Sequence, residues 1–222
     1  MTSAPALAAA APGAIVTFGA YPQTAVGADR TPIRWRVLDR SGGALYLLSE
    51  LVLDCRRWHR AAVATTWRDC DLRRWLGRDF LAAAFDDRER ARIRITTCAD
   101  NGVGSPVTRD RVFLPSVAEL RALTDPGDGP RRRRTYATAQ ARVRRADGCH
   151  LYVYDKGVER DYVVDDDGRH GCSWWWTRTQ LQIAHGRSAR AAFIGARSNI
   201  KSYGAIELAR CGVRPAIKLR LP

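Results

Sequence analysis

Two apolar, β-favouring segments near the C-terminal end most constrain the fold of this chain. Residues 174–176 (W-W-W) and 213–219 (V-R-P-A-I-K-L) are rich in the aromatic and branched side chains that favour strands. Between them lies a segment rich in Arg, Ser, Gly and other polar residues. Strands at both ends would hold that polar segment in place, so the pattern favours a binding surface carried on a rigid scaffold.

The composition is that of a globular, basic protein. The 222 residues are 45% hydrophobic, include seven Trp and have a net charge of +14. Such a charge suggests a nucleic-acid partner. However, only three of the 37 basic residues are Lys and the Arg residues are scattered, which also fits the codon usage of a GC-rich genome. The one Arg cluster, at 131–134, follows the turn sequence D-P-G-D-G-P. We interpret this cluster as a solvated loop in preference to an anion-binding site.

Local patterns predict an α+β chain with strands at both ends. Residues 14–18, 33–37 and 45–49 combine β-favouring residues with apolar alternation or flanking turn signals, as strands do. Residues 1–13 are Ala-rich and lack the basic and long apolar regions of a signal peptide, so we predict a disordered leader there. Without a clear linker or repeat further on, residues 14–222 are predicted to form a single domain.

Several short helices are predicted between the strands. An apolar i, i+3, i+4 pattern predicts a short helix that ends at Gly77, and residues 79–85 are predicted to form a second helical turn. Asp86 with Glu89, and Ser116 with Glu119, have the spacing of capping boxes and predict two more helix starts. Large aromatic residues in apolar-periodic positions are predicted to be buried, namely Trp35, Trp67, Trp75, Phe80 and Phe113.

Five groups of motifs, in order along the chain, resemble those of one protein family. They are F-G-A-Y-P-Q at 18–23, P-I-R-W-R-V-L at 32–38, T-W-R-D-C-D-L-R-R-W-L at 66–76, D-R-V-F-L-P-S at 110–116, and W-W-T-R-T at 175–179 with G-V-R-P-A at 212–216. The chain is similar to an uncharacterised bacterial domain family of the C-type-lectin-like superfamily. That superfamily also contains formylglycine-generating enzymes and the variable proteins of diversity-generating retroelements. Cys70 stands where the family usually has Ser.

The resemblance implies a C-type-lectin-like fold within the α+β class. Such a fold has paired terminal strands, two or more short helices packed on the core, and a long irregular segment that forms the ligand face. We therefore expect the strand at 14–18 to pair with the strand at 213–219. The fold alone does not fix the function, because unrelated activities share it.

The polar segment is the predicted ligand-binding region, since the variable proteins carry their ligand-contacting positions in this stretch. Tyr and Arg contribute most per residue at protein interfaces, and Ser and Asn make adaptable contacts. Trp174 is included because the family pattern assigns Trp175 and Trp176 and leaves Trp174 as the exposed aromatic candidate. The predicted residues are Trp174, Gln180, Gln182, His185, Arg187, Arg190, Arg197, Ser198, Asn199, Lys201, Tyr203, Glu207 and Arg210. For any one of them alone, a solvated loop position is the plainer interpretation.

Catalytic and metal sites are not predicted. The six Cys form no C-x-x-C pair, and the four His do not cluster, so a zinc site is not indicated. Cys172 and Cys211 lie near the region where formylglycine-generating relatives use a cysteine pair, but buried thiols are the preferred interpretation. The calcium-lectin motifs are absent, and D-D-D-G at 165–168 is interpreted as a turn. No cofactor is expected.

The predicted function is non-catalytic recognition of a protein or cell-surface partner through residues 180–210, in the manner of a retroelement-diversified variable protein. An accessory protein is a further expected partner. The alternatives are a formylglycine-generating-type oxidase and a basic anion- or nucleic-acid-binding protein, the latter testable by salt-dependent DNA binding. No apolar run approaches the roughly 18 residues of a membrane helix. We expect a cytoplasmic protein, or one exported without a classical signal peptide.

Overall fold

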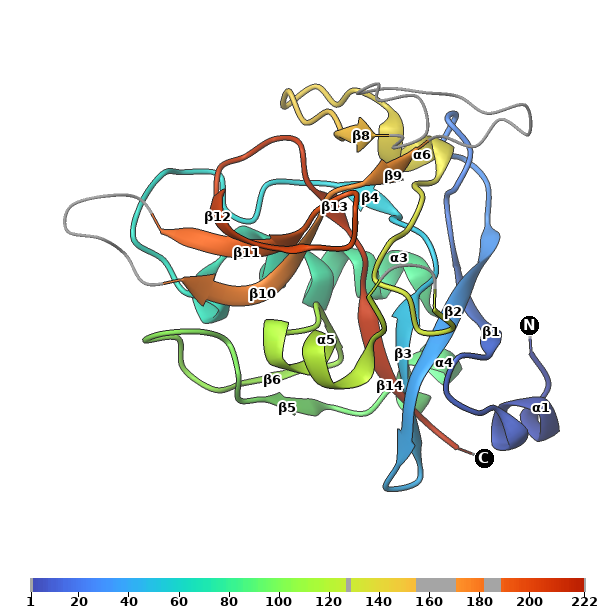
Figure 1. Ribbon diagram of the computed structural model, residues 1–222. Helices are drawn as coiled ribbons and strands as arrows, with labels where there is room; N and C mark the ends of the chain where they lie inside the picture. Colours follow the sequence, from blue (N-terminus) through green and yellow to red (C-terminus); the bar gives the residue numbers. More distant parts are fainter. Residues whose placement is uncertain (1, 127–128, 155–170, 182–188, 222) are drawn as a thin grey trace.

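The computed structural model describes residues 2–126, 129–154, 171–181 and 189–221 (Figure 1). It has an α+β fold in which two curled five-stranded sheets and two small two-stranded sheets are accompanied by short helices. The predicted class is thus confirmed. The two small sheets pair β5 (Thr96–Cys98) with β6 (Thr108–Asp110) and β8 (Val153–Tyr154) with β9 (Cys172–Ser173).

The first large sheet is built around a strand that is buried along its whole length. All six residues of β3 are buried, as expected of a central strand with a partner on each side. In spatial order, the strands of this sheet are β1 (Ile15–Tyr21), β2 (Thr31–Ser41), β3 (Ala44–Ser49), β14 (Ala216–Arg220) and β7 (Val112–Phe113).

The expected pairing of the terminal strands is wrong. β1 and β14 belong to the same sheet, but β2 and β3 lie between them. The reason is local: Gly42 and Gly43 adopt φ values of 56° and 70°, which allow a two-residue turn and make β2 and β3 a hairpin. The apolar β3 then pairs with β14 through its other edge over five residues.

The second large sheet is continuous with the first through a two-stranded ribbon. Its strands, in spatial order, are β12 (Ile200–Ala205), β11 (Arg190–Ile194), β10 (Trp175–Leu181), β13 (Gly212–Val213) and β4 (Asp54–Cys55). β4 pairs with β13 in the second sheet, and β3 pairs with β14 in the first. Between these two pairings, the Leu53 N–H donates to Val213 O (3.0 Å) and the Ser49 N–H donates to Pro215 O (2.9 Å), so the two chain segments stay hydrogen-bonded from one sheet to the other. Figure 1 shows β13 and β14 running as one red path from the second sheet into the first.

The helices are short and lie between or beside the strands. Both predicted capping boxes are confirmed, with Asp86 and Glu89 opening α4 and Ser116 and Glu119 opening α5. Within the described residues, no helix is long and apolar enough to cross a membrane. The helices are α1 (Ala4–Ala9), η1 (Trp67–Asp69), α2 (Asp71–Trp75), η2 (Leu76–Phe80), α3 (Leu81–Ala84), α4 (Asp87–Arg92), α5 (Val117–Leu123) and α6 (Ala139–Arg142).

The helix predicted to end at Gly77 continues to Ala84. α2 passes through the π-helical turn η2 into α3 without a break. Four side chains at intervals of four residues, Leu72, Leu76, Phe80 and Ala84, are all buried. This apolar stripe stabilises the helix beyond the glycine, because tertiary packing outweighs the low helix propensity of a single Gly.

One cluster of buried side chains includes residues of both large sheets and of several helices. Trp35, Trp67, Phe80 and Phe113 are fully buried as predicted, whereas Trp75 is only partly buried. The N-terminal residues also belong to this cluster: Leu7 of α1 is 1% exposed, and the Thr2 N–H donates to Thr17 O (3.2 Å). The expectation of a disordered leader is therefore wrong, because α1 covers part of the core with an apolar side chain.

Candidate functional site

Five side chains share one face of the second large sheet. Trp176 lies opposite Phe193, and Phe193 lies opposite Lys201, so all three project from the same face. Trp174 and Tyr203 join this face through their rings, which both contact the Phe193 ring. The face therefore carries aromatic side chains from the segment at 174–176, from β11 and from β12.

The aromatic rings on this face form a continuous series of contacts. The Tyr152 ring lies 4.0 Å from that of Trp174, measured between centroids, and Trp174 lies 5.2 Å from Phe193. Phe193 in turn packs edge-on against Tyr203 at 5.5 Å. We call these four residues the aromatic strip. Phe193 is buried, Tyr152 and Trp174 are half-buried, and Tyr203 is 56% exposed, so the strip rises from the core to the surface.

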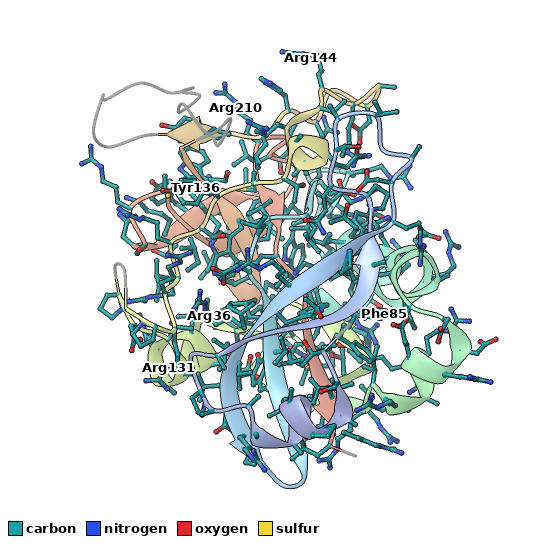
Figure 2. The ribbon with its side chains drawn as sticks, turned by 90° about the vertical axis from the view of Figure 1, so that its right-hand side faces the viewer. Arg36, Phe85, Arg131, Tyr136, Arg144 and Arg210 are labelled. Carbon is teal, nitrogen blue, oxygen red and sulfur yellow. The ribbon has the colours of Figure 1, made fainter. Side chains whose placement is uncertain are left out.

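A positive side chain lies over each end of the aromatic strip. Lys201 Nζ is 5.8 Å from the centroid of Tyr203, and Arg210 Cζ is 5.9 Å from that of Tyr152. Burial, followed by the charges of Arg144 and Arg210, lowers the pKa of His150 next to Tyr152 in the chain. Figure 2 shows Arg210 and Arg144 toward the same end of the molecule. The Tyr152 end of the strip is thus electropositive.

Backbone geometry beneath the strip requires small residues and a tight turn. A Cβ at Gly204 would lie 2.7 Å from the Trp176 ring and 2.8 Å from Ala191 O, so only Gly fits against these strands. Between β11 and β12, Ser198 adopts a φ of 69° and donates its N–H to Gly195 O at 3.0 Å. This turn points Arg197 and Asn199 to the surface.

The predicted ligand-binding residues divide into three groups. Gln180 and Ser198 are 5% and 4% exposed, so the structure does not place either side chain as an exposed contact residue. The backbone N–H of Gln180 donates to Asn101 O at 2.8 Å, which packs Gln180 against the neighbouring segment. Ser198 is buried in the tight turn between β11 and β12. The half-buried or exposed group is Trp174, Arg190, Arg197, Asn199, Lys201, Tyr203, Glu207 and Arg210. Gln182, His185, Arg187 and the D-D-D-G segment at 165–168 lie outside the described residues.

Two members of the aromatic strip, Tyr152 and Phe193, were not predicted. Phe193 lies in an apolar run that indicates burial, and Tyr152 is distant in sequence from the polar segment. Their roles depend on cross-strand and inter-sheet contacts, which a single sequence does not contain. The only available signal for Tyr152 was its place in an alternating L-Y-V-Y run.

The arginine of the W-W-T-R-T motif is a buried structural residue. Arg178 is 1% exposed and donates to both Glu119 oxygens (2.6 and 2.8 Å), to Asn101 Oδ1 (2.9 Å) and to Leu114 O (2.8 Å). Burial would raise the pKa of Glu119, but the hydrogen bonds and charge of Arg178 outweigh burial and leave that pKa below its ordinary value. The Tyr46 hydroxyl also donates to Glu119, at 2.8 Å.

The arginine of the G-V-R-P-A motif is buried as well. Arg214 donates to Ser49 O (2.6 Å) and Arg133 O (3.0 Å) and lies over the Trp175 ring at 5.1 Å. Nearby, Glu50 bonds Arg36 and Arg132 at 2.6 and 2.8 Å. The loop at 131–134 is therefore partly buried and supports this cluster; its interpretation as a solvated loop is wrong.

The cysteines are arranged differently from the expected pair. All six are buried thiols, as preferred. Cys149 and Cys211 both lie near Cys55, and the strongest influence on the pKa of Cys55, a hydrogen bond with Cys149, raises that pKa. Cys149 Sγ also accepts from Arg57 Nη1 at 3.4 Å. Among the described residues, no group of three or more His, Cys, Asp or Glu side chains is placed to hold a metal ion.

Comparison with known proteins gives one result. A search of curated proteins found no match, and neither did a search of solved structures. The family model described as Domain of unknown function (DUF6273) matches residues 42–221. This match spans most of the chain, from the turn before β3 to the end of β14, and includes the whole aromatic strip. The chain belongs to the DUF6273 family.

Proposed function

We propose that this protein is a non-catalytic recognition module that binds a protein or cell-surface partner through the aromatic strip. The observation that carries the proposal is the unbroken contact from Tyr152 to Tyr203, with a cation over each end. Tyr, Trp and Arg are the residue types most enriched among interface hot spots. Rings that are packed against one another lose little conformational entropy on binding, which favours affinity.

We further propose that the fold is C-type-lectin-like and that the partner-binding positions tolerate variation, as in the variable proteins of diversity-generating retroelements. Two observations support this proposal. The buried motif residues Trp175, Trp176, Arg178 and Arg214 supply a scaffold that does not depend on the exposed positions. Arg197, Asn199 and Tyr203 are exposed on or beside that scaffold. A reverse transcriptase gene and a near-copy of the C-terminal coding segment beside this gene would support diversification, and their absence would contradict it.

The proposed function is tested on an array of immobilised proteins and oligosaccharides. The wild-type protein and a Lys201→Ala/Tyr203→Ala variant are compared on every spot. Ser202→Ala is the matched control, because Ser202 is an exposed residue of the same strand that is not part of the aromatic strip. We expect the array to contain ligands for which the double variant loses more than about 1 kcal/mol of binding free energy, the usual threshold for a contributing interface residue. Ser202→Ala should bind these ligands like the wild type.

Two outcomes would contradict the proposal. One is an array on which every bound ligand retains its affinity for the double variant. The other is an equal loss in the double variant and in Ser202→Ala. Circular dichroism and thermal unfolding of each variant ensure that a lost signal reflects the surface and not the fold.

A further inference from the structure

A second candidate binding site lies outside the aromatic strip. A cleft of about 680 Å³ is formed by the loop that follows β4, by α2 and η2, and by the loop after α6. Small-molecule sites typically have volumes of roughly 300–1,000 Å³. Five Arg and three Asp line the cleft, and Leu72 and Trp75 form its apolar wall. We call it the arginine cleft; none of its lining residues belongs to the aromatic strip.

Two of the arginines are held in place by the protein. The Arg56 guanidinium lies 4.1 Å from the centroid of Trp75, while its carboxylate partner, Asp54, is shared with Arg145. Arg57 donates to Glu207 O at 3.1 Å and to Asp147 O at 2.9 Å. The side chains of Arg56 and Arg57 are 30% and 23% exposed, so both are partly desolvated donors with little freedom to lose on binding.

The other three arginines are at the rim and are weakly restrained. Arg60 and Arg74 share one carboxylate, that of Asp71, at 3.7 and 2.7 Å, and Arg78 pairs with Asp79 at 2.8 Å. Their side chains are 82%, 63% and 85% exposed. Exposed ion pairs contribute only about 0–1 kcal/mol, so a ligand anion can compete with these partners.

We propose that the arginine cleft binds a phosphorylated small molecule. Guanidinium groups bind phosphate oxygens in pairs, and one phosphate group offers three acceptor oxygens and nearly two negative charges. Several arginines around one cleft therefore match a diphosphate better than a single carboxylate. The exposed part of Trp75 offers an apolar surface for the organic part of the ligand. This site is independent of the proposed function, because none of its residues carries that function.

The probes are inorganic pyrophosphate, adenosine diphosphate and citrate, each titrated calorimetrically at low ionic strength, where exposed charges are least screened. We expect pyrophosphate and adenosine diphosphate to bind with Kd values below about 1 mM and more tightly than citrate. In Arg74→Gln/Arg78→Gln, their affinities should fall by about tenfold or more, because two charge-assisted phosphate contacts are lost. Arg34→Gln/Arg88→Gln removes two exposed positive charges elsewhere and should change affinity by less than about twofold.

Arg56→Lys provides a second test that preserves the charge. Lysine lacks the planar fork that stacks on Trp75, so we expect weaker pyrophosphate binding without a loss of net charge. Tyr203→Ala should leave pyrophosphate binding unchanged, which separates this site from the aromatic strip. The proposal is overturned if neither phosphate probe binds, if citrate binds more tightly than pyrophosphate, or if the cleft and control double variants lose affinity equally.

Discussion

Each guanidinium nitrogen of Arg178 has a hydrogen-bond partner although the side chain is buried. Its guanidinium bonds both oxygens of Glu119 and the oxygens of Asn101 and Leu114. Glu119 also closes the capping box of α5 by accepting the Ser116 N–H at 2.9 Å. One ion pair thus connects β10 to the start of a helix, so we assign this motif arginine to stability and not to ligand contact.

Arg178→Ala should destabilise the protein by about 3–5 kcal/mol, because it removes a fully buried guanidinium and leaves the half-buried Glu119 carboxylate without its counter-charge. The free energy of unfolding is measured by urea titration. Arg34→Ala, at an exposed position of β2, is the control and should cost under about 0.5 kcal/mol. A loss below about 1 kcal/mol for Arg178→Ala would mean that the pair does not hold the two elements together.

At the scale of elements, short-range signals predicted local structure well. The capping boxes at Asp86 and Ser116 depend on residues three positions apart, and both are present. Long-range choices could not be predicted in the same way. The pairing of β14 with β3 depends on which apolar edge the hairpin leaves open, and the burial of Ser198 depends on the tight turn between β11 and β12. The aromatic strip likewise required the register of three strands.

Gly77 provides a test of the continuous helix from α2 to α3. Nothing lies within 4 Å of a Cβ built there, and its backbone is not in the left-handed region. Gly77→Ala should therefore stabilise the protein by about 0.5–1 kcal/mol, through higher helix propensity and a less flexible unfolded chain. Thermal and urea unfolding measure the change.

The matched control for Gly77→Ala is Gly212→Ala. A Cβ at Gly212 would lie 2.3 Å from Val52 Cγ1 and 3.1 Å from Leu151 Cδ1, so this variant should be less stable than the wild type. If Gly77→Ala also lowered the free energy of unfolding, the result would contradict a continuous helix from α2 to α3.

At the scale of the whole molecule, two carboxylates that pair with arginines make stability depend on pH. Burial raises the pKa of Glu50 and of Glu119, but hydrogen bonds and the charges of neighbouring arginines outweigh it and lower both below the ordinary value of 4.5. A carboxyl group whose pKa is lower in the folded than in the unfolded state stabilises the protein fully above the unfolded-state pKa of 4.5. This stabilisation is lost as the pH falls through the folded-state pKa.

The free energy of unfolding should accordingly fall as the pH drops below about 4.5, where the unfolded carboxylates bind protons first. Urea titrations at successive pH values measure it. Asp87→Asn is the control, because the Asp87 side chain is 96% exposed. A stability that stays constant or rises over that acid range would show that the two carboxylates are not stabilised by their arginines.

For the whole molecule, we expect the aromatic strip to be the surface that contacts the partner. The most direct measurement is hydroxyl-radical footprinting of the wild-type protein with and without a partner found on the array. Oxidation of Tyr203 and Trp174 should decrease in the complex, while oxidation of the half-buried Trp75, outside the strip, should not change. Protection of Trp75 with no protection of Tyr203 or Trp174 would contradict the account.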